Sequence, residues 1–287
     1  MRVLITGGSG FIGSHVVDKL IENEYDVRIL DLETPYLDNV DFIKGSILDS
    51  DTVFKATLDI DIIFHFAGFS NVDKVHDDPL GTIKSNILGT ATILDNARIQ
   101  GIHRVVLASS VYLYDNCEHL YTYSKQVSEK LCIYYQKSFG LPYTIMRLST
   151  AYGPRSRGED VISIFVRQSL TGGQIVVKNN GKQIRNFIYV EDLAEACVKV
   201  LSKNCINKIL TIAGYEPLNI YDLSILIKNL CNEKVNIKLE KSNERYYDYS
   251  GEIENIDESY KMLNWKPAVN LEMGIKKYIK WSKNHLL

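Results

Sequence analysis

The sequence predicts an α/β fold in which a doubly wound parallel sheet is joined to a smaller C-terminal α/β lobe. Short apolar runs alternate with longer amphipathic stretches through the first half of the chain. Continuous Val/Ile/Leu runs separated by helical patterns are typical of a parallel sheet covered on both faces. Right-handed crossovers between such strands give the doubly wound arrangement. The expected strands are 2–6, 26–31, 61–66, 103–109 and 142–148, and the expected helices cover about 11–23, 80–100 and 121–138.

A change of rhythm after Gly153-Pro154 indicates the second lobe. The run 186–201 has the pattern of one further strand and helix, which we expect to return to the main sheet. From about residue 205 the elements become short and polar turns separate them. We therefore predict a first domain at 1–152, with 186–204 returning to it, and a second lobe that covers mainly 153–287.

Composition and charge are those of an ordinary globular protein. Of the 287 residues, 45% are apolar and 24% charged, and the formal net charge is −2. This balance favours neither a nucleic-acid partner nor a membrane surface, and no apolar run approaches the roughly 18 residues that span a bilayer. The chain opens with a strand and a turn in place of a signal peptide, and its five cysteines are scattered. We expect a cytoplasmic protein without disulfides and without a metal site.

A glycine-rich turn, GGSGFIG, follows the first expected strand and opens the first helix. Gly7, Gly10 and Gly13 permit a tight turn, close approach of the backbone to a pyrophosphate, and close packing of the helix on the strand. Asp31 ends the second strand, where a carboxylate binds the 2′-hydroxyl of a ribose and repels a 2′-phosphate. Arg28 lies earlier in that strand, poorly placed to bind such a phosphate. The sequence therefore predicts a Rossmann domain that binds NAD in preference to NADP.

Tyr121 and Lys125 form the candidate proton-transfer pair. They stand four residues apart near the start of an expected helix, so they share one face. An ammonium close to a phenol favours the phenolate and lowers the phenol pKa. Ser110 ends the preceding strand, at the edge of the sheet where ligands bind. We predict that these three residues are catalytic. We expect Tyr112 and Tyr114 to form the wall of the site and to pack against it, and the Ser109 side chain to cap backbone groups by hydrogen bonding.

Several motifs occur together in one order along nearly the whole chain: GGSGFIG, HFAG (65–68), N-x-x-G-T (86–90), Ser110, YTYSK, RLSTAYGP (147–154) and RNFIYVEDLAEA (185–196). In this combination the sequence resembles an extended short-chain dehydrogenase/reductase of the NAD-dependent epimerase/dehydratase family, close in pattern to nucleotide-sugar 4-epimerases. After about residue 240 the resemblance fades to NIDESYKMLNWKP.

The resemblance assigns roles to individual residues. It implies a cofactor site made of Gly7, Gly10, Phe11, Ile12, Gly13, Asp31, Ser46, Ile47, Ala67, Gly68, Asn86, Tyr121 and Lys125. For a nucleotide-diphosphate sugar it implies contacts from Ser110, Thr150, Arg185 and Arg245. Three features depart from the family pattern: Thr150 replaces an asparagine, Tyr249 stands where an arginine is usual, and the segment between Ser110 and Tyr121 is short.

The resemblance also implies that C4 of the sugar is oxidised by hydride transfer to NAD. Relatives that eliminate water carry an Asp-Glu pair directly after the Ser/Thr, and decarboxylating relatives keep a glutamate there, whereas this chain has Val111 and Tyr112. A 4-epimerase of polysaccharide biosynthesis is favoured, and a nucleotide-sugar 4-dehydrogenase or 4-ketoreductase is the alternative. A catalytically silent NAD-binding sensor is disfavoured, because a sensor needs no proton-transfer pair. The base and the sugar stay open.

We further expect a homodimer. The helices at 80–100 and 121–138 carry apolar residues that we expect to point outward, such as Ile93, Leu131 and Tyr135. In similar proteins this pair of helices forms a four-helix interface with a second copy, and two-fold dimers are the commonest oligomers.

Overall fold

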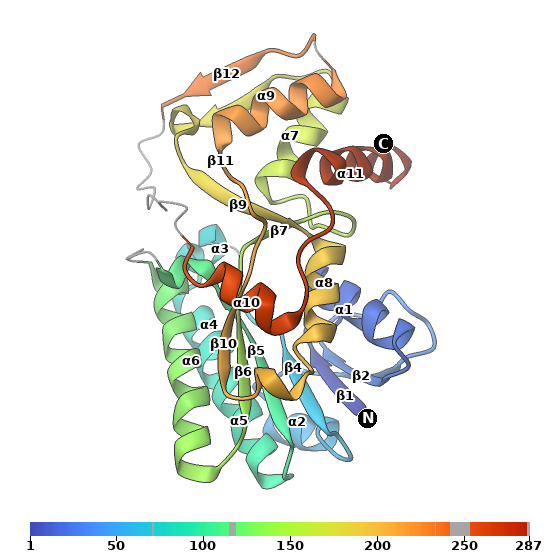
Figure 1. Ribbon diagram of the computed structural model, residues 1–287, viewed down its shortest axis with the longest axis vertical. Helices are drawn as coiled ribbons and strands as arrows, with labels where there is room; N and C mark the ends of the chain where they lie inside the picture. Colours follow the sequence, from blue (N-terminus) through green and yellow to red (C-terminus); the bar gives the residue numbers. More distant parts are fainter. Residues whose placement is uncertain (71, 115–118, 233, 242–252, 286–287) are drawn as a thin grey trace. The chain divides into compact units, whose positions relative to one another are not determined.

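The computed structural model describes residues 1–70, 72–114, 119–232, 234–241 and 253–285 (Figure 1). The chain folds into two compact units. Unit 1 comprises Met1–Leu148, Ala194–Ile212 and Glu254–Trp265, and unit 2 comprises Ser149–Leu193, Ala213–Ile253 and Lys266–Leu287. Each unit is therefore assembled from separate stretches of sequence.

Unit 1 is built on a seven-stranded sheet with the order β10-β6-β5-β4-β1-β2-β3. Every pairing between these strands is parallel. The strands are β1 (Arg2–Thr6), β2 (Asp26–Asp31), β3 (Asp41–Lys44), β4 (Ile62–His65), β5 (Arg104–Ser110), β6 (Tyr143–Leu148) and β10 (Lys208–Ile212). The strand order reverses between β1 and β4, which is the point where ligands bind in such sheets. The predicted doubly wound fold is confirmed.

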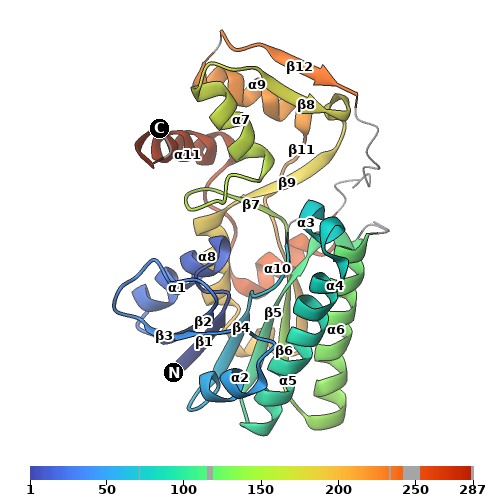
Figure 2. The same ribbon diagram turned by 180° about the vertical axis from the view of Figure 1, so that it is seen from behind.

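Helices cover both faces of this sheet, as Figures 1 and 2 show for α1 (Phe11–Glu22) and α8 (Val190–Lys199) on one side and α5 (Gly89–Ile99) and α6 (Leu120–Phe139) on the other. The remaining helical elements of the unit are α2 (Ser50–Ala56), α3 (Val72–Asp77), α4 (Pro79–Thr82), η1 (Ile83–Leu88), η2 (Val111–Tyr114), η4 (Lys203–Cys205) and α10 (Ile256–Leu263). Strand periodicity explains the two-sided cover. On β6, Ile145 joins the core beneath α2, α5 and α6, while the sulfur of its neighbour Met146 lies 3.9 Å from that of Cys197 on α8.

Unit 2 contains two small sheets. A three-stranded sheet has the order β11-β9-β7, and a two-stranded one pairs β12 with β8. The elements are β7 (Thr150–Tyr152), α7 (Val161–Leu170), β8 (Ile175–Lys178), η3 (Asn179–Gly181), β9 (Ile184–Tyr189), β11 (Pro217–Asn219), α9 (Ile220–Cys231), β12 (Ile237–Glu240) and α11 (Leu271–His285). Side chains from both sheets and the helices, among them Tyr152, Phe165, Ile227 and Tyr278, bury a core of their own.

Two expectations about position were wrong. The strand at 184–189 does not return to the main sheet: β9 pairs with β7 and β11, and β10 supplies the seventh strand. Ile93 does not point outward, because it is fully buried in the core between α5 and the sheet. Leu131 and Tyr135 are half-buried and pack against the same core.

The expected helix at 80–100 is three elements. Between α4 and α5 the chain forms η1, a π-helical stretch from Ile83 to Leu88. A π-turn holds more residues than an α-turn and commonly marks a functional position. Here η1 contains Asn86, which is buried.

Three further findings concern the described part of the chain. None of its helices is long and apolar enough to cross a membrane. Its side chains form no cluster that could hold a metal ion. Its cysteines, Cys132, Cys197, Cys205 and Cys231, are free thiols.

The burial of Ile93 can be tested against an exposed isoleucine of the same unit. Ile93→Ala should lower the free energy of unfolding by about 2–5 kcal/mol, because it leaves a cavity in a packed core. Ile21→Ala on α1, where the side chain is 42% exposed, should change it by about 0.5 kcal/mol or less. Urea unfolding followed by circular dichroism measures both. Equal effects of the two variants would contradict the core position of Ile93.

Candidate active site

The turn between β1 and α1 is shaped for an anion. Gly7 has φ +77°, and a Cβ there would lie 2.6 Å from the backbone nitrogen of Ala67. A Cβ on Gly13 would lie 2.0 Å from the carbonyl oxygen of Gly7. Gly10 is the N-cap of α1 and makes no side-chain cap, so the first turn with Phe11 and Ile12 keeps its N–H groups for a ligand. Only glycine satisfies this packing.

Asp31 lies beside this turn. Its carboxylate accepts hydrogen bonds from the backbone N–H groups of Ser9 (2.9 Å) and Glu33 (3.1 Å). The Asp31 side chain is thereby fixed next to the glycine turn, and its oxygens keep lone pairs with which to accept ribose hydroxyls. The sequence prediction placed it here, and the structure brings it to the turn.

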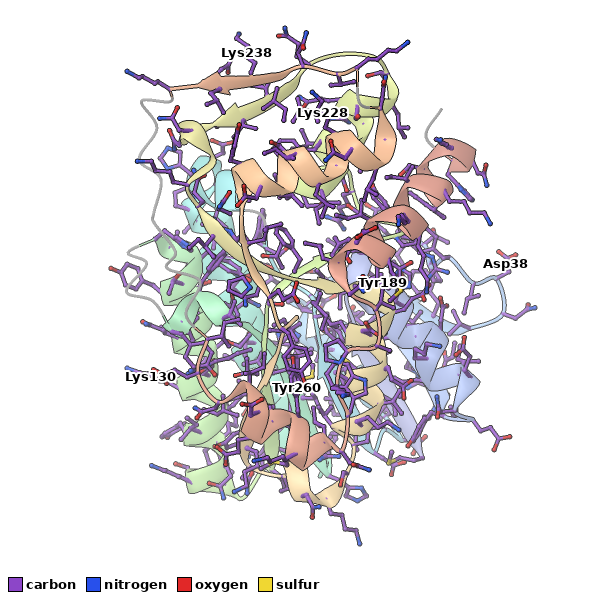
Figure 3. All side chains as sticks on the ribbon, turned by 45° about the horizontal axis from the view of Figure 1, so that its top comes forward. Asp38, Lys130, Tyr189, Lys228, Lys238 and Tyr260 are labelled. Atoms are coloured by element: carbon purple, nitrogen blue, oxygen red, sulfur yellow. The ribbon has the colours of Figure 1, made fainter. Side chains whose placement is uncertain are left out.

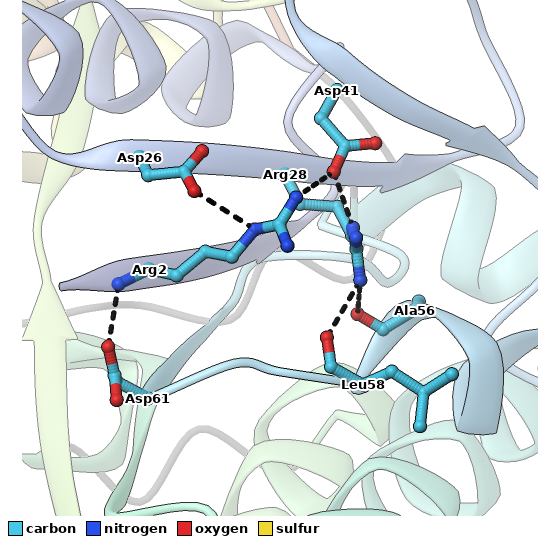
Figure 4. A network of polar contacts seen from close by, with 7 residues as sticks. All are labelled: Arg2, Asp26, Arg28, Asp41, Ala56, Leu58 and Asp61. Carbon is cyan, nitrogen blue, oxygen red and sulfur yellow. Dashed lines mark hydrogen bonds and ion pairs between the residues drawn. The ribbon is translucent and has the colours of Figure 1, made fainter.

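Arg28 is engaged elsewhere (Figure 4). Its Nε donates to Asp41 at 2.7 Å, and its Nη1 donates to the carbonyl oxygens of Ala56 (3.2 Å) and Leu58 (2.9 Å). Arg2 donates to the same Asp41 carboxylate at 2.6 Å. The Arg28 guanidinium therefore ties β2 to β3 and to the end of α2, and it is not directed at Asp31.

Asn86 connects the segment after β4 to α6. Its Oδ1 accepts from the Phe69 N–H at 2.8 Å, and its Nδ2 donates to the Phe69 carbonyl (3.0 Å) and to Ser124 Oγ (2.9 Å). Gly68 has φ +148°, and a Cβ on it would lie 2.6 Å from Asn86 Oδ1. Ala67 and Gly68 thus lie in a backbone segment that Asn86 holds against the helix that carries Tyr121.

His65, at the end of β4, precedes the same segment and forms hydrogen bonds inside unit 1. Its ring lies 2.7 Å from Thr6 Oγ1 and 3.1 Å from Thr90 Oγ1. Burial lowers the pKa of His65 to about 3, so the imidazole is neutral at physiological pH. The HFAG motif therefore supplies a neutral hydrogen-bonded ring under the cofactor segment.

Ser46 and Ile47 follow β3. The Ser46 hydroxyl oxygen accepts from the Leu48 N–H at 3.1 Å. Ile47 is buried, and its Cδ1 would lie 2.4 Å from a Cβ on Gly89 of α5. Ile47 is thus part of the core beneath α5.

Ser110, Tyr121 and Lys125 lie together at the carboxyl end of β5, and all three are buried. The Lys125 ammonium donates to the Ala108 carbonyl at 2.8 Å and lies 5.8 Å from the centre of the Tyr121 ring. Ser110 lies close enough to Tyr121 to lower the pKa of its phenol. Tyr123, by contrast, is 47% exposed. Of the two tyrosines in YTYSK, Tyr121 is therefore buried near Lys125, whereas Tyr123 is exposed.

The charges of this group follow mainly from burial. Burial raises the pKa of Tyr121 to about 12, although the hydrogen bond with Ser110 acts in the opposite direction. This is contrary to our expectation of a lowered value. Burial also lowers the pKa of Lys125 to about 8, against the opposing effect of Glu129. At neutral pH the protein alone thus presents a neutral phenol beside a largely protonated lysine.

Sequence reasoning missed three residues that surround this group. His119 is the N-cap of α6: its Nδ1 accepts from the Thr122 N–H at 3.1 Å, and its ring stacks on Tyr121 with centres 5.9 Å apart. Tyr112 packs edge-on against both rings, as expected of a wall residue. A capping histidine is rare among helix N-caps, so composition alone gave no signal for it.

The other two missed residues are Glu129 and Arg147, which form an ion pair in which Glu129 is buried and Arg147 partly buried. Ser109 was expected to cap backbone, and this was wrong: its hydroxyl donates to Glu129 Oε1 at 2.5 Å. Tyr114 packs as expected, with the Arg147 guanidinium 4.7 Å above its ring centre. The i, i+4 spacing of Glu129 from Lys125 on one helix was the available signal.

Two of the candidate substrate contacts, Thr150 and Arg185, lie in unit 2. Thr150 begins β7 and pairs with Phe187 of the parallel strand β9, on which Arg185 lies two residues earlier. Paired residues and residues two apart share one face of a sheet, so Thr150 and Arg185 lie on the same face of this small sheet. Arg245 and Tyr249 lie outside the described residues.

The family model for the NAD dependent epimerase/dehydratase family matches residues 3–213. The chain belongs to this family. It is an NAD-dependent enzyme of the extended short-chain dehydrogenase/reductase type, as the glycine turn, Asp31 and the buried Tyr121–Lys125 pair indicated.

Individual relatives differ in the reaction named for them. The chain is 34% identical to a putative UDP-glucose 4-epimerase of Methanocaldococcus jannaschii, over 99% of both chains. It is 30% identical to UDP-glucuronic acid decarboxylase 1 of Xenopus tropicalis, over 99% of this chain and 73% of the relative. Its structure is similar to that of a Thermotoga maritima UDP-glucose 4-epimerase with UDP-glucose, with a TM-score of 0.91, 26% identity and full coverage of both chains.

The cofactor preference can be tested at Asp31. Asp31→Ser should narrow the preference for NAD over NADP by about tenfold or more, because the carboxylate that accepts ribose hydroxyls and repels a 2′-phosphate is gone. Binding titrations with both cofactors measure the ratio.

Arg28→Gln is the matched control for that experiment. It should leave the cofactor ratio unchanged while lowering the free energy of unfolding by about 1–3 kcal/mol, since Arg28 bonds Asp41 and two carbonyls. A changed ratio in this variant, or an unchanged ratio in Asp31→Ser, would contradict the assignment of Asp31.

Proposed function

We propose that this enzyme is a nucleotide-sugar 4-epimerase, which oxidises C4 of a sugar carried on a nucleoside diphosphate and reduces it again from the opposite face. The observation that carries the proposal is the buried set of Ser110, Tyr121 and Lys125 at the carboxyl end of β5. The 4-epimerases among the similar proteins support C4 as the reacting position.

Tyr121 is the proton acceptor and Ser110 the orienting group in this proposal. As a phenolate, Tyr121 receives the proton of the C4 hydroxyl, and the neighbouring Ser110 hydroxyl holds that oxygen in line. Bound NAD would supply the acceptor for the C4 hydride and the donor for its return. Tyr121 then gives the proton back to the oxygen of the re-reduced carbon.

Lys125 makes this proton transfer possible at neutral pH. Burial holds the Tyr121 pKa near 12 in the protein alone, so the phenolate needs positive charge close by. The Lys125 ammonium lies 5.8 Å from the ring centre, and an oxidised nicotinamide is itself cationic. Lys125 also anchors to Ala108, which fixes its charge at the end of β5.

The residues after Ser110 favour epimerisation over elimination. Val111 is buried, and the ring of Tyr112 packs edge-on against Tyr121. Neither is a carboxylic acid, the kind of residue with which eliminating relatives remove a proton from C5 and protonate the leaving hydroxyl. A ketone formed at C4 therefore has return of the hydride as its productive route.

Thr150 and Arg185 are our candidates for the substrate diphosphate. They lie on one face of the sheet formed by β7 and β9. A guanidinium binds phosphate oxygens in a bidentate manner, and a threonine hydroxyl can donate to a third oxygen. This supports a ligand with adjacent phosphates.

The reaction is tested with Tyr121→Phe and its neighbour Tyr123→Phe. The first variant should lower kcat about 100-fold or more while still binding NAD, because only the transferable proton is removed. The second should keep wild-type activity, since Tyr123 is exposed. A panel of nucleotide sugars is followed by NMR for the C4 epimer and by absorbance at about 340 nm for released reduced cofactor.

The two readouts distinguish the candidate reactions. Conversion to a C4 epimer without net reduced cofactor supports the proposal. Stoichiometric reduced cofactor with a released ketone would replace it by a 4-dehydrogenase or 4-ketoreductase. Unchanged activity in Tyr121→Phe would remove the catalytic role of that residue.

We also propose a homodimer formed through α6 and its neighbours. Tyr123, Val127 and Tyr134 are exposed and recur at helical spacing along one stripe of α6. Lys130, labelled in Figure 3, is exposed on the same stripe. On η1, Leu88 is 54% exposed. Apolar stripes of this kind on adjacent helices are typical of helix–helix interfaces.

A charge placed on this stripe tests the dimer. Val127→Glu should convert a dimer to a monomer, because an unpaired carboxylate would be buried in the interface. Leu239→Glu, at an exposed position of unit 2, should leave the oligomeric state unchanged. Light scattering at micromolar concentration measures both, and a wild-type monomer would rule the proposal out.

A further inference from the structure

Glu129 is a buried acid for which the proposed chemistry has no direct use. It stands on the same face of α6 as Tyr121 and Lys125, at successive intervals of four residues, and it is only 5% exposed. The adjacent Lys130 is exposed (Figure 3). A carboxylate is rarely buried unless it is paired, so its position calls for an explanation.

Three hydrogen bonds hold the Glu129 carboxylate. Arg147 donates through Nε to Oε1 at 3.0 Å and through Nη2 to Oε2 at 2.8 Å. Ser109 donates its hydroxyl to Oε1 at 2.5 Å. The bidentate geometry and the third donor fix the carboxylate in one position.

The same end of β5 receives both charged side chains of α6. Lys125 donates to the carbonyl of Ala108 at 2.8 Å, and Glu129 accepts from the side chain of Ser109, the next residue. Ser110, the third residue of this run, lies close enough to Tyr121 to lower its pKa. Three successive residues of one strand thus lie against three residues spaced by one helical turn.

Arg147 is itself fixed from its other side. Its guanidinium lies 4.7 Å above the ring centre of Tyr114, whose hydroxyl lies 2.5 Å from Thr211 Oγ1 on β10. The ion pair is therefore part of a network that runs from α6 across β5 and β6 to β10. Its rigidity keeps the negative charge at one position relative to Lys125.

We propose that Glu129 is a positioning residue that keeps the Lys125 side chain protonated and in place for proton transfer by Tyr121. This inference rests on the proposed function, because it assigns a purpose to the charge on Lys125. Desolvation disfavours a buried ammonium, and a nearby fixed carboxylate opposes that effect. The lowered pKa of Lys125, about 8, agrees with this balance, since Glu129 is the group that raises it against burial.

The sign of the effect follows directly. With the carboxylate removed, the ammonium loses its stabilising neighbour, so the Lys125 pKa falls from about 8 toward neutrality. Lys125 then becomes neutral at a pH where the wild-type side chain is charged. Activity should consequently fall on the alkaline side of the pH profile at a lower pH than in the wild type.

The experiment measures the protonation of Lys125 itself. Protein labelled with ¹⁵N-lysine is titrated by NMR, and the Lys125 Nζ signal is assigned by its loss in Lys125→Met. In Glu129→Gln the midpoint should fall by about one pH unit or more, a tenfold weaker proton affinity. In Ser109→Ala, which keeps the carboxylate and its Arg147 partner, the midpoint should stay near the wild-type value.

A second variant controls for the possibility that Glu129→Gln prevents correct folding. Glu129→Gln leaves the partly buried Arg147 without its partner, so Glu129→Gln/Arg147→Gln, which has no lone charge, is measured beside it. The midpoint of Lys125 should fall in this double variant too. A wild-type midpoint in either folded variant would overturn the proposal.

Activity measurements separate this inference from the function on which it rests. If Glu129→Gln lowers the Lys125 midpoint and moves the alkaline limb of kcat with it, the positioning role is supported. If the midpoint falls but the wild type converts no nucleotide sugar, the proposed function fails while the electrostatic role of Glu129 stands. If the wild type is active and the midpoint is unchanged, the positioning role alone fails.

Discussion

The packing of α6 against the carboxyl end of β5 is the constraint on which the rest of the site depends. Lys125 donates to the carbonyl of Ala108, and Glu129 accepts from the hydroxyl of Ser109. Tyr121 lies beside Ser110 at the end of the same strand. On the neighbouring side, Asn86 bonds Ser124 of α6 and both backbone groups of Phe69. The cofactor segment after β4 and the proton-transfer pair are therefore held by the same helix. A shift of α6 by a fraction of a turn would disturb both at once, which is why so many of its contacts are polar and directional.

Much of the fold and of the cofactor site could be predicted because the signals are local. Gly7, Gly10 and Gly13 act within one turn, and Asp31 is defined by the end of its strand. Ser110, Tyr121 and Lys125 were found from helix spacing and strand edges alone. The pair of Glu129 and Arg147 was not, because it joins a helix to a strand 18 residues away in sequence. The i, i+4 spacing of Glu129 from Lys125 places it on the same helix face, but that spacing does not reveal its partner on β6.

The positional errors have specific physical causes. Ile93 was expected to point outward because similar proteins use this pair of helices in a dimer interface. The structure instead buries it in the core, after a π-helical stretch from Ile83 to Leu88 that the sequence analysis did not foresee. The strand at 184–189 carries an apolar run that suits any buried sheet, so its residues could not reveal which sheet it joins. Register and topology are long-range properties that a short run does not encode.

The ionisation of the site indicates how cofactor binding and chemistry are linked. Burial moves the two partners in opposite directions: the Tyr121 pKa rises to about 12 and the Lys125 pKa falls to about 8. Both shifts disfavour the charged form of the group. The protein alone therefore holds a neutral phenol at Tyr121 beside a Lys125 ammonium that loses its proton more readily than usual. One fixed carboxylate, Glu129, retains the ammonium, and the cationic nicotinamide adds the positive charge that the phenolate still lacks.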